Sequence, residues 1–135
     1  MSTTEDRFVI EVPGEPEAVG TARLFATSVA RVTGIDDETV EDVRLAVSEA
    51  VTERIRSTEG AFAPVCITAI VREKTVEFEI TGGTASPSDG GRLGLAVIRS
   101  LFPDVAVDES PPAVRFAAPR EPHEARADQD VNLGA

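Results

Sequence analysis

The sequence predicts an α+β two-layer sandwich, in which three helices lie on one face of a mixed or antiparallel sheet. Two observations carry this prediction. Segments of alternating apolar and polar residues occur at both ends and in the middle of the chain, and segments with helical periodicity lie between them. With 135 residues and a hydrophobic fraction of 41%, the chain is long enough to bury one core. The expected order is strand, helix, helix, strand, strand, helix, strand, strand.

The first strand and helix are indicated by residues 7–34. "RFVIEVPG" alternates in the manner of a short strand and breaks at Pro13-Gly14. Pro16 suits the first position of a helix, and Gly34 suits the position after its end. Apolar residues recur between them at helical spacing and predict the buried stripe: Ala18, Ala22, Phe25, Val29 and Val32.

The second helix is expected to start at Asp36 or Asp37, which are good N-cap residues, and to end between Ser57 and Gly60. Its buried stripe reads Val40, Val43, Val47, Ala50 and Val51. At 100° per residue, a neighbouring face carries Asp42, Ala46, Glu49 and Glu53.

Two features of this helix need an explanation. Glu49 and Glu53 place like charges one turn apart, which is mildly destabilising. Arg54 falls on the otherwise apolar stripe. It either pairs with nearby acids, as Arg56 also could, or extends its charged end from the rim of the core into water.

The second half of the chain predicts a hairpin, a helix and two strands. "PVCITAIVRE" and "TVEFEITGG" are two strands that turn near Glu73-Lys74, and Cys66 is expected to be a small buried apolar residue. A Gly/Ser/Pro loop leads to a helix over 92–102, which Pro103 ends, and "DVAVDES" and "PAVRFAAP" predict the last strands. The folded domain is therefore expected to span 1–118.

Residues 119–135 have almost no large apolar side chains and are expected to form a disordered acidic tail. The only histidine, His123, lies there, where no other ligand types are expected to cluster with it in a folded segment, so we expect no catalytic or metal role for it.

Charge and cysteine content limit the classes of partner. The net charge of −11 argues against direct binding of nucleic acid, because that affinity comes mainly from Lys and Arg at phosphates. The charge suits either simple solubility or a basic protein partner. A single cysteine, a polar N-terminus and the lack of a long apolar run lead us to expect a cytoplasmic protein that is not bound to a membrane.

Four segments in register carry a family pattern. "LAVSEAVTERI" (45–55) resembles an N-box helix that reads roughly L-A-V-x-E-A-V-T-N. "FEITGGTASP" (78–87) lies where a strand should run into D-x-G-x-G, and "GGRLGLAVIRSLFPDVAV" (90–107) resembles a glycine-rich box with its helix and next strand. "TARLFATSV" (21–29) is similar to an arginine-containing first helix. Together they resemble the bacterial anti-sigma factor serine kinases, which have the GHKL, or histidine kinase-like, ATPase fold.

The resemblance implies a role for several positions. Glu49 matches the base that accepts a proton from a serine hydroxyl of the substrate protein. Glu53 takes the place of the Asn that holds Mg²⁺ against the ATP phosphates, and Gly82 takes the place of the Asp that reads adenine. Thr84 and Ser86 stand where glycines are expected, and no Asp lies between positions 76 and 88.

Three further residues match the family pattern, but the sequence allows two roles for the glycines and two for the arginine. Gly91 and Gly94 retain the glycine box, either for an anion at a helix N-terminus or only as turn and packing glycines. Arg23 matches a first-helix Arg that contacts partners in the family, although the sequence alone favours an ordinary exposed helix arginine.

These matches imply a regulator that binds a sigma factor, a STAS-domain anti-anti-sigma factor, or both, usually as a homodimer. The lost Asn and Asp favour a pseudokinase without ATP or Mg²⁺. The alternative is an active protein serine kinase that uses Glu49 as base and Glu53 as an unusual Mg²⁺ ligand, and phosphorylates a STAS protein. A third possibility is a scaffolding fragment without a sigma partner.

Overall fold

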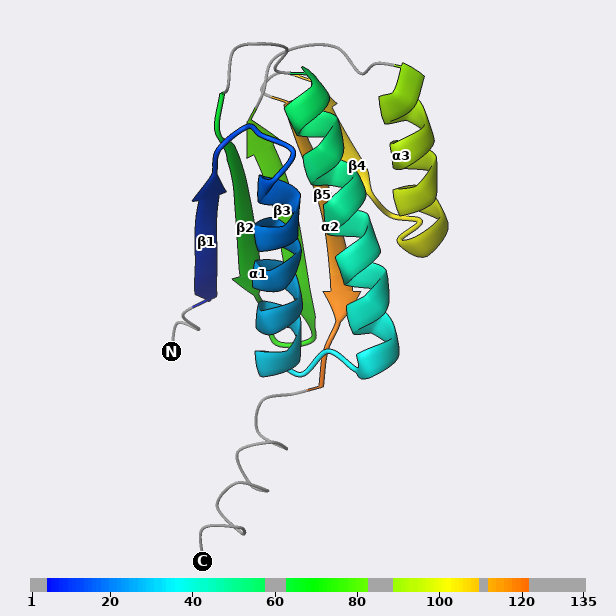
Figure 1. Ribbon diagram of the computed structural model, residues 1–135. Coiled ribbons are helices and arrows are strands. Elements are labelled where there is room, and N and C mark those ends of the chain that lie inside the picture. The colour runs from blue at the N-terminus through cyan, green and yellow to red at the C-terminus, as the bar shows by residue number, and fades with distance from the viewer. Residues whose placement is uncertain (1–4, 58–62, 83–88, 110–111, 122–135) are drawn as a thin grey trace, which may run out of the picture.

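The computed structural model describes residues 5–57, 63–82, 89–109 and 112–121 of the chain (Figure 1). Its helices and strands follow the expected order, and the predicted fold class is confirmed. The elements are β1 (Asp6–Val12), α1 (Ala18–Val32), α2 (Asp37–Ser57), β2 (Val65–Val71), β3 (Thr75–Gly82), α3 (Asp89–Leu101), β4 (Ala106–Glu109) and β5 (Pro112–Pro119).

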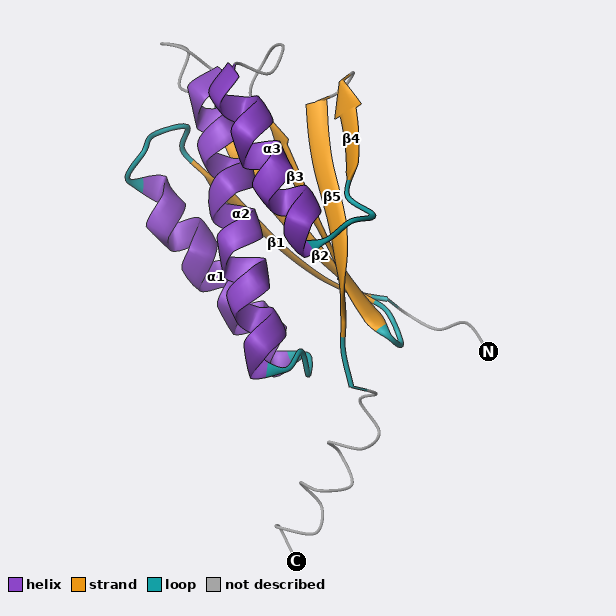
Figure 2. Ribbon diagram, turned by 90° about the vertical axis from the view of Figure 1, so that its right-hand side faces the viewer, coloured by secondary structure: helices purple, strands orange, loops and turns teal. Residues whose placement is uncertain are grey.

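The five strands form one sheet in the order β1-β2-β3-β5-β4, and every neighbouring pair is antiparallel. Of the two sheet types that the sequence allowed, the antiparallel one is therefore present. The three helices cover one face, and the other face has no layer on it within the described part of the chain (Figure 2). No helix in the described ranges is both long enough and apolar enough to cross a membrane.

Helix α1 differs from the prediction at both ends. It begins at Ala18 after Glu17, so Pro16 precedes the helix instead of starting it. Val32 is 65% exposed, because the core at this last turn is filled by Thr33 and Ile35, which follow it. Gly34 ends the helix as expected, with a φ of 93° that favours glycine.

Helix α2 agrees with the prediction along its whole length. Asp36 caps it, because its Oδ1 accepts a hydrogen bond from the backbone N–H of Thr39 at 2.8 Å. This hydrogen bond is the main reason why the pKa of Asp36 lies below its usual value. The predicted buried stripe is confirmed, since its members are at most 1% exposed: Val40, Val43, Val47, Ala50 and Val51.

The hairpin of β2 and β3 forms at the predicted turn, but Cys66 is only half-buried. Side chains alternate between the two faces of a strand, and Ile67 takes the core side. Cys66 therefore lies on the open face beside Thr68, with 3.9 Å between Sγ and Oγ1. The expectation that Cys66 is a buried apolar residue was wrong.

Three aromatic rings connect the sheet to the end of α3. The Phe116 ring centroid lies 5.4 Å from that of Phe78 and 4.6 Å from that of Phe102, in stacked arrangements. All three side chains are buried. These contacts hold the helical layer to the centre of the sheet.

Arg120, which we assigned to the tail, ties two turns of the domain together. Its Nε donates to the backbone oxygen of Thr33 at 2.6 Å, directly after α1. Its Nη1 donates to the backbone oxygens of Arg72 (2.6 Å) and Glu73 (2.8 Å) in the β2–β3 turn. The folded structure thus continues past Pro119 to residue 121, while His123 and the rest of the expected tail lie outside the described residues.

We expect Arg120→Ala to lower the free energy of unfolding by about 1–3 kcal/mol, because hydrogen bonds from a charged donor are lost at two turns together. Urea titration followed by circular dichroism measures the loss. Arg120→Lys is the matched control: it keeps the charge, but a single ammonium cannot reproduce the planar fork, so most of the loss should remain. Full stability of both variants would contradict this role.

Candidate functional site

The predicted site residues come from three elements that meet at one end of the domain. The C-terminal end of α2, the end of β3 and the start of α3 lie at the same end of the two layers (Figure 1). These elements carry Glu49 and Glu53, Gly82, and Gly94, respectively. The site residues predicted on distant parts of the sequence are therefore brought to one region of the fold.

Gly94 lets α3 pack directly on Glu49. A Cβ atom at Gly94 would lie 3.0 Å from Oε2 of Glu49 and 3.8 Å from its backbone oxygen. Gly94 is buried and the Glu49 side chain is half-buried at this contact. Of the two interpretations of Gly94, close packing of two helices is the one that this contact supports, and the carboxylate of Glu49 still reaches solvent.

Glu53 and Arg54 form a buried pair of opposite charges one turn further along α2. Their relative exposures are only 8% and 5%. Burial lowers the pKa of the Arg54 guanidinium below its usual value, and the negative charge of Glu53 acts in the opposite direction. Of the two interpretations of Arg54, interaction with a nearby acid is therefore supported, and extension of its charged end into water is not. Arg54 is buried because it lies on the stripe of α2 that faces the core.

Gly82, in the place of the adenine-reading Asp, has a backbone that no other residue adopts easily. Its φ is +111°, in the region that favours glycine. A Cβ atom there would lie 2.4 Å from the backbone oxygen of Pro64 and 3.1 Å from Cα of Val65. The backbone at the start of β2 therefore occupies the space that the Cβ of an Asp at this position would need.

The other predicted residues contribute less to the geometry. Helix α3 begins at Asp89, three residues before the expected Arg92, so Gly91 lies in its first turn. Thr84, Ser86 and the side chain of Arg56 lie outside the described residues. The half-buried Arg23 on α1 turns back along its helix, with Nη2 3.9 Å from the position of a Cβ at Gly20.

Among the described residues, no three or more His, Cys, Asp or Glu side chains are grouped so that they could hold a metal ion. Glu53, which the resemblance places at the metal, is next to the guanidinium of Arg54, and a nearby cation opposes the binding of Mg²⁺.

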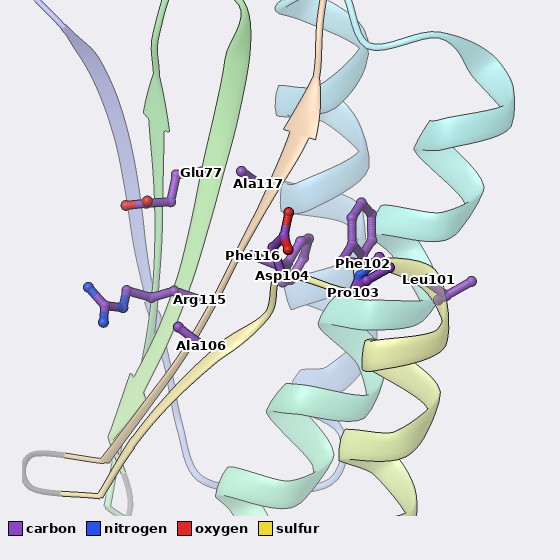
Figure 3. Close-up of a pocket in the computed structure, with 9 residues that line it drawn as sticks. All are labelled: Glu77, Leu101, Phe102, Pro103, Asp104, Ala106, Arg115, Phe116 and Ala117. Carbon is purple, nitrogen blue, oxygen red and sulfur yellow. The ribbon is translucent and has the colours of Figure 1, made fainter.

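A groove that the sequence did not predict lies between the end of α3 and the edge of β5 (Figure 3). It has a volume of about 380 Å³. Phe102 and Phe116 form its apolar part, and Glu77, Asp104 and Arg115 bring charges to it. Arg115 is already held by Asp108 at 2.8 Å, and the remaining charges are acidic, so the groove is unsuited to a nucleotide phosphate. No local motif marks it, because its residues come from four separate elements.

The fold and the grouping of an N-box-like helix with a glycine-containing helix define a class: GHKL-type domains. A model of the histidine kinase-like ATPase domain family matches residues 12–117, which is most of the chain. The chain belongs to this family, and the resemblance to the anti-sigma factor serine kinases is confirmed.

The chain is also similar to individual proteins described as serine-protein kinases. The serine-protein kinase RsbW of Bacillus pumilus is 26% identical over 98% of this chain and 96% of its own length. The serine-protein kinase RsbW of Listeria monocytogenes is 36% identical, but over 42% of this chain and only 36% of that protein. A crystal structure of the RsbU and RsbW domains of Rv1364c from Mycobacterium tuberculosis has a TM-score of 0.68 at 14% identity. That similarity covers 87% of this chain and 32% of the other, and it shows the fold alone.

Proposed function

We propose that the protein is an anti-sigma factor-like regulator that binds a sigma factor, a STAS-domain antagonist, or both, and that it does not transfer phosphate. The observation that carries the proposal is the buried pair of Glu53 and Arg54 on α2. The position at which the family has an amide oxygen for Mg²⁺ instead holds a carboxylate, and the next residue carries a buried positive charge. Attraction between these two charges leaves less for a second cation.

Gly82 supports the same conclusion for the base of the nucleotide. It has no side chain that could accept a hydrogen bond from the adenine amino group, and the backbone oxygen of Pro64 occupies the space where a side chain would begin. A lost hydrogen bond to a ligand costs about 1–3 kcal/mol, which is up to roughly a hundredfold in affinity. Phosphoryl transfer depends mainly on positioning and on the metal, so weakness at both points removes the basis for kinase activity.

Binding of a protein partner needs none of these groups. The resemblance to the anti-sigma factor serine kinases implies the class of partners. The net charge of −11 suits a basic partner, because opposite charges accelerate the encounter of two proteins. Arg23 remains our candidate for a contact on α1. The proposed regulator acts as a homodimer.

The test measures nucleotide and partner binding on the same full-length sample. We expect calorimetry to detect no binding of ATP with Mg²⁺ at millimolar concentration. We expect a sigma factor or STAS protein from the same cell to bind without nucleotide. Arg23→Ala should weaken that binding about tenfold or more, as loss of an interface arginine often does, whereas Arg44→Ala, at an exposed position on α2, serves as the control.

Two results would overturn the proposal in different ways. Stoichiometric ATP·Mg binding that Glu53→Ala abolishes would establish the alternative, an active serine kinase with Glu49 as its base. Failure to bind any sigma factor or STAS protein of its own cell would leave a scaffolding role instead.

A further inference from the structure

The groove between the end of α3 and the edge of β5 lies apart from the candidate functional site. Helix α3 starts beside that site and ends at Leu101, so the groove is at the other end of the helix (Figure 1). Its volume of about 380 Å³ falls within the range of ligand-binding sites. Three properties of its walls indicate what it binds: free backbone groups, two aromatic rings and an excess of acidic charge.

Hydrogen bonds at the end of β5 show that Ala117 directs its backbone groups toward the groove. The N–H of Arg120 donates to the oxygen of Lys74, just before β3, at 3.0 Å, so position 120 points toward β3. Because direction alternates along a strand, Ala118 also points toward β3, and Ala117 points to the opposite side. Pro119, which has no N–H to donate to β3, fits the same alternation.

Strand β4 is too short to cover Ala117. Its register with β5 ends at the pair of Ala106 and Arg115. Before Ala106 the chain turns away from β5, and the N–H of Val105 donates to the oxygen of Phe102 at 3.0 Å. Among the described residues, no strand pairs with Ala117 on this side, and Ala117 is exposed. An exposed strand edge of this kind can accept one more short strand.

A strand added at this edge would place its side chains in two different surroundings. The residue that faces Ala117 would direct its side chain to the open face of the sheet, where Ala117 and its register partner Glu77 lie (Figure 3). The residues before and after it would point to the helix side. There the buried rings of Phe102 and Phe116 line the groove. A fitting segment therefore has a polar residue between two apolar ones.

The charge that suits the central residue is positive. The carboxylate of Glu77 lies 3.8 Å from Nη2 of Arg72, which is longer than a hydrogen bond. Asp104 is exposed, and none of the ion pairs within the described ranges includes it. The positive charge of Arg115 is offset by Asp108 at 2.8 Å. The groove therefore has an excess of negative charge, which a Lys or Arg complements.

We propose that this groove is the docking site for an extended segment of a partner protein, in which a Lys or Arg lies between two apolar residues. The segment adds a short strand to β5 beyond the end of β4, as peptides do at other exposed sheet edges. Its central residue exchanges hydrogen bonds with Ala117 and reaches Glu77, and the flanking residues pack on Phe102 and Phe116. The surface goes beyond the proposed function, since it requires neither the nucleotide site nor Arg23.

The test uses nuclear magnetic resonance on the full ¹⁵N-labelled chain and two pentapeptides with blocked ends. One peptide has the sequence Thr-Phe-Lys-Val-Thr, and its matched control has Glu in place of Lys. We expect the lysine peptide, at millimolar concentration, to shift the backbone amides of Ala117 and of residues 104–106 in a saturable manner. The glutamate peptide should bind about tenfold more weakly or worse, because its charge opposes those of Glu77 and Asp104.

Variants of the chain locate the contact. Ala117→Pro removes the N–H that points to the groove but none that pairs with β3, so circular dichroism should be unchanged while binding of the lysine peptide is lost. Ala117→Ser keeps this N–H and is the matched control, which should bind as the wild type does. Glu77→Gln/Asp104→Asn leaves every backbone group in place and should remove most of the preference for the lysine peptide. If Ala117→Pro disturbs the fold, this preference decides.

Several results would overturn the proposal. A lysine peptide that leaves the amide of Ala117 unshifted, or that binds no better than the glutamate peptide, would show that the groove takes no such segment. Binding that persists in a folded Ala117→Pro, or a preference that Glu77→Gln/Asp104→Asn leaves unchanged, would place the contact elsewhere. Phenethylamine that gives the same shifts at the same concentration would indicate a site for a small amine instead. Sigma or STAS binding by a chain that fails this test would leave the proposed function intact.

Discussion

Gly82→Asp should destabilise the domain by about 2–5 kcal/mol and should not create ATP binding, although it restores the residue that the family uses to read adenine. Any Cβ at this position requires a residue other than glycine at a φ of +111°. It also places that atom 2.4 Å from the backbone oxygen of Pro64. Urea unfolding measures the first effect, and calorimetry with ATP and Mg²⁺ measures the second.

Gly82→Ala separates the backbone effect from the effect of the carboxylate. Both variants share the φ strain and the contact with Pro64, so we expect their free energies of unfolding to agree within about 1 kcal/mol. A fully stable Gly82→Asp that bound ATP would show that the backbone at the start of β2 moves easily. The missing carboxylate at position 82 would then be the main reason for weak ATP binding.

The elements whose patterns are local could be predicted from the sequence. The stripe of α2 and the N-cap at Asp36 depend on residues within a few turns of each other, and both are present. The β2–β3 hairpin likewise follows from alternation and a short turn. Hydrophobic periodicity and capping act along the chain, which is why the sequence alone reveals them.

Features that depend on distant residues were missed or wrong. Arg120 looks like part of a charged tail, yet its partners Thr33 and Arg72 lie 87 and 48 residues away. Cys66 and Ile67 are both apolar, and only the pairing with the neighbouring strands decides which one faces the core. Nothing within a short window of sequence carries that information.

The candidate site shows the same division. Matching to a family pattern assigned candidate roles to Glu49, Glu53 and Gly82, because their spacing is local to a helix or a strand end. It did not reveal that Pro64 stands against Gly82, or that α3 packs on Glu49 through Gly94. Those contacts join segments that only the folded sheet and helices bring together. They explain why a residue without a side chain is needed at positions 82 and 94.

Arg54→Met should lower the free energy of unfolding by about 3–5 kcal/mol at neutral pH, because it leaves the buried carboxylate of Glu53 without its compensating charge. Both residues are less than 10% exposed, so water cannot replace the lost interaction easily. Methionine keeps a long apolar side chain on the stripe that continues from Val51, so packing changes little. Chemical denaturation monitored by circular dichroism gives the value.

A double-mutant cycle identifies the pair as the cause. Glu53→Gln removes the opposite charge at nearly constant volume and should also destabilise, since the buried charge of Arg54 then loses the negative charge of Glu53. The double variant, Glu53→Gln/Arg54→Met, buries no charge at either position and should lose less stability than the sum of the single variants, by about 1–3 kcal/mol. Additive losses would mean that Glu53 and Arg54 are stabilised separately. Compensation between the two buried charges would then no longer support the proposal that this helix binds no Mg²⁺.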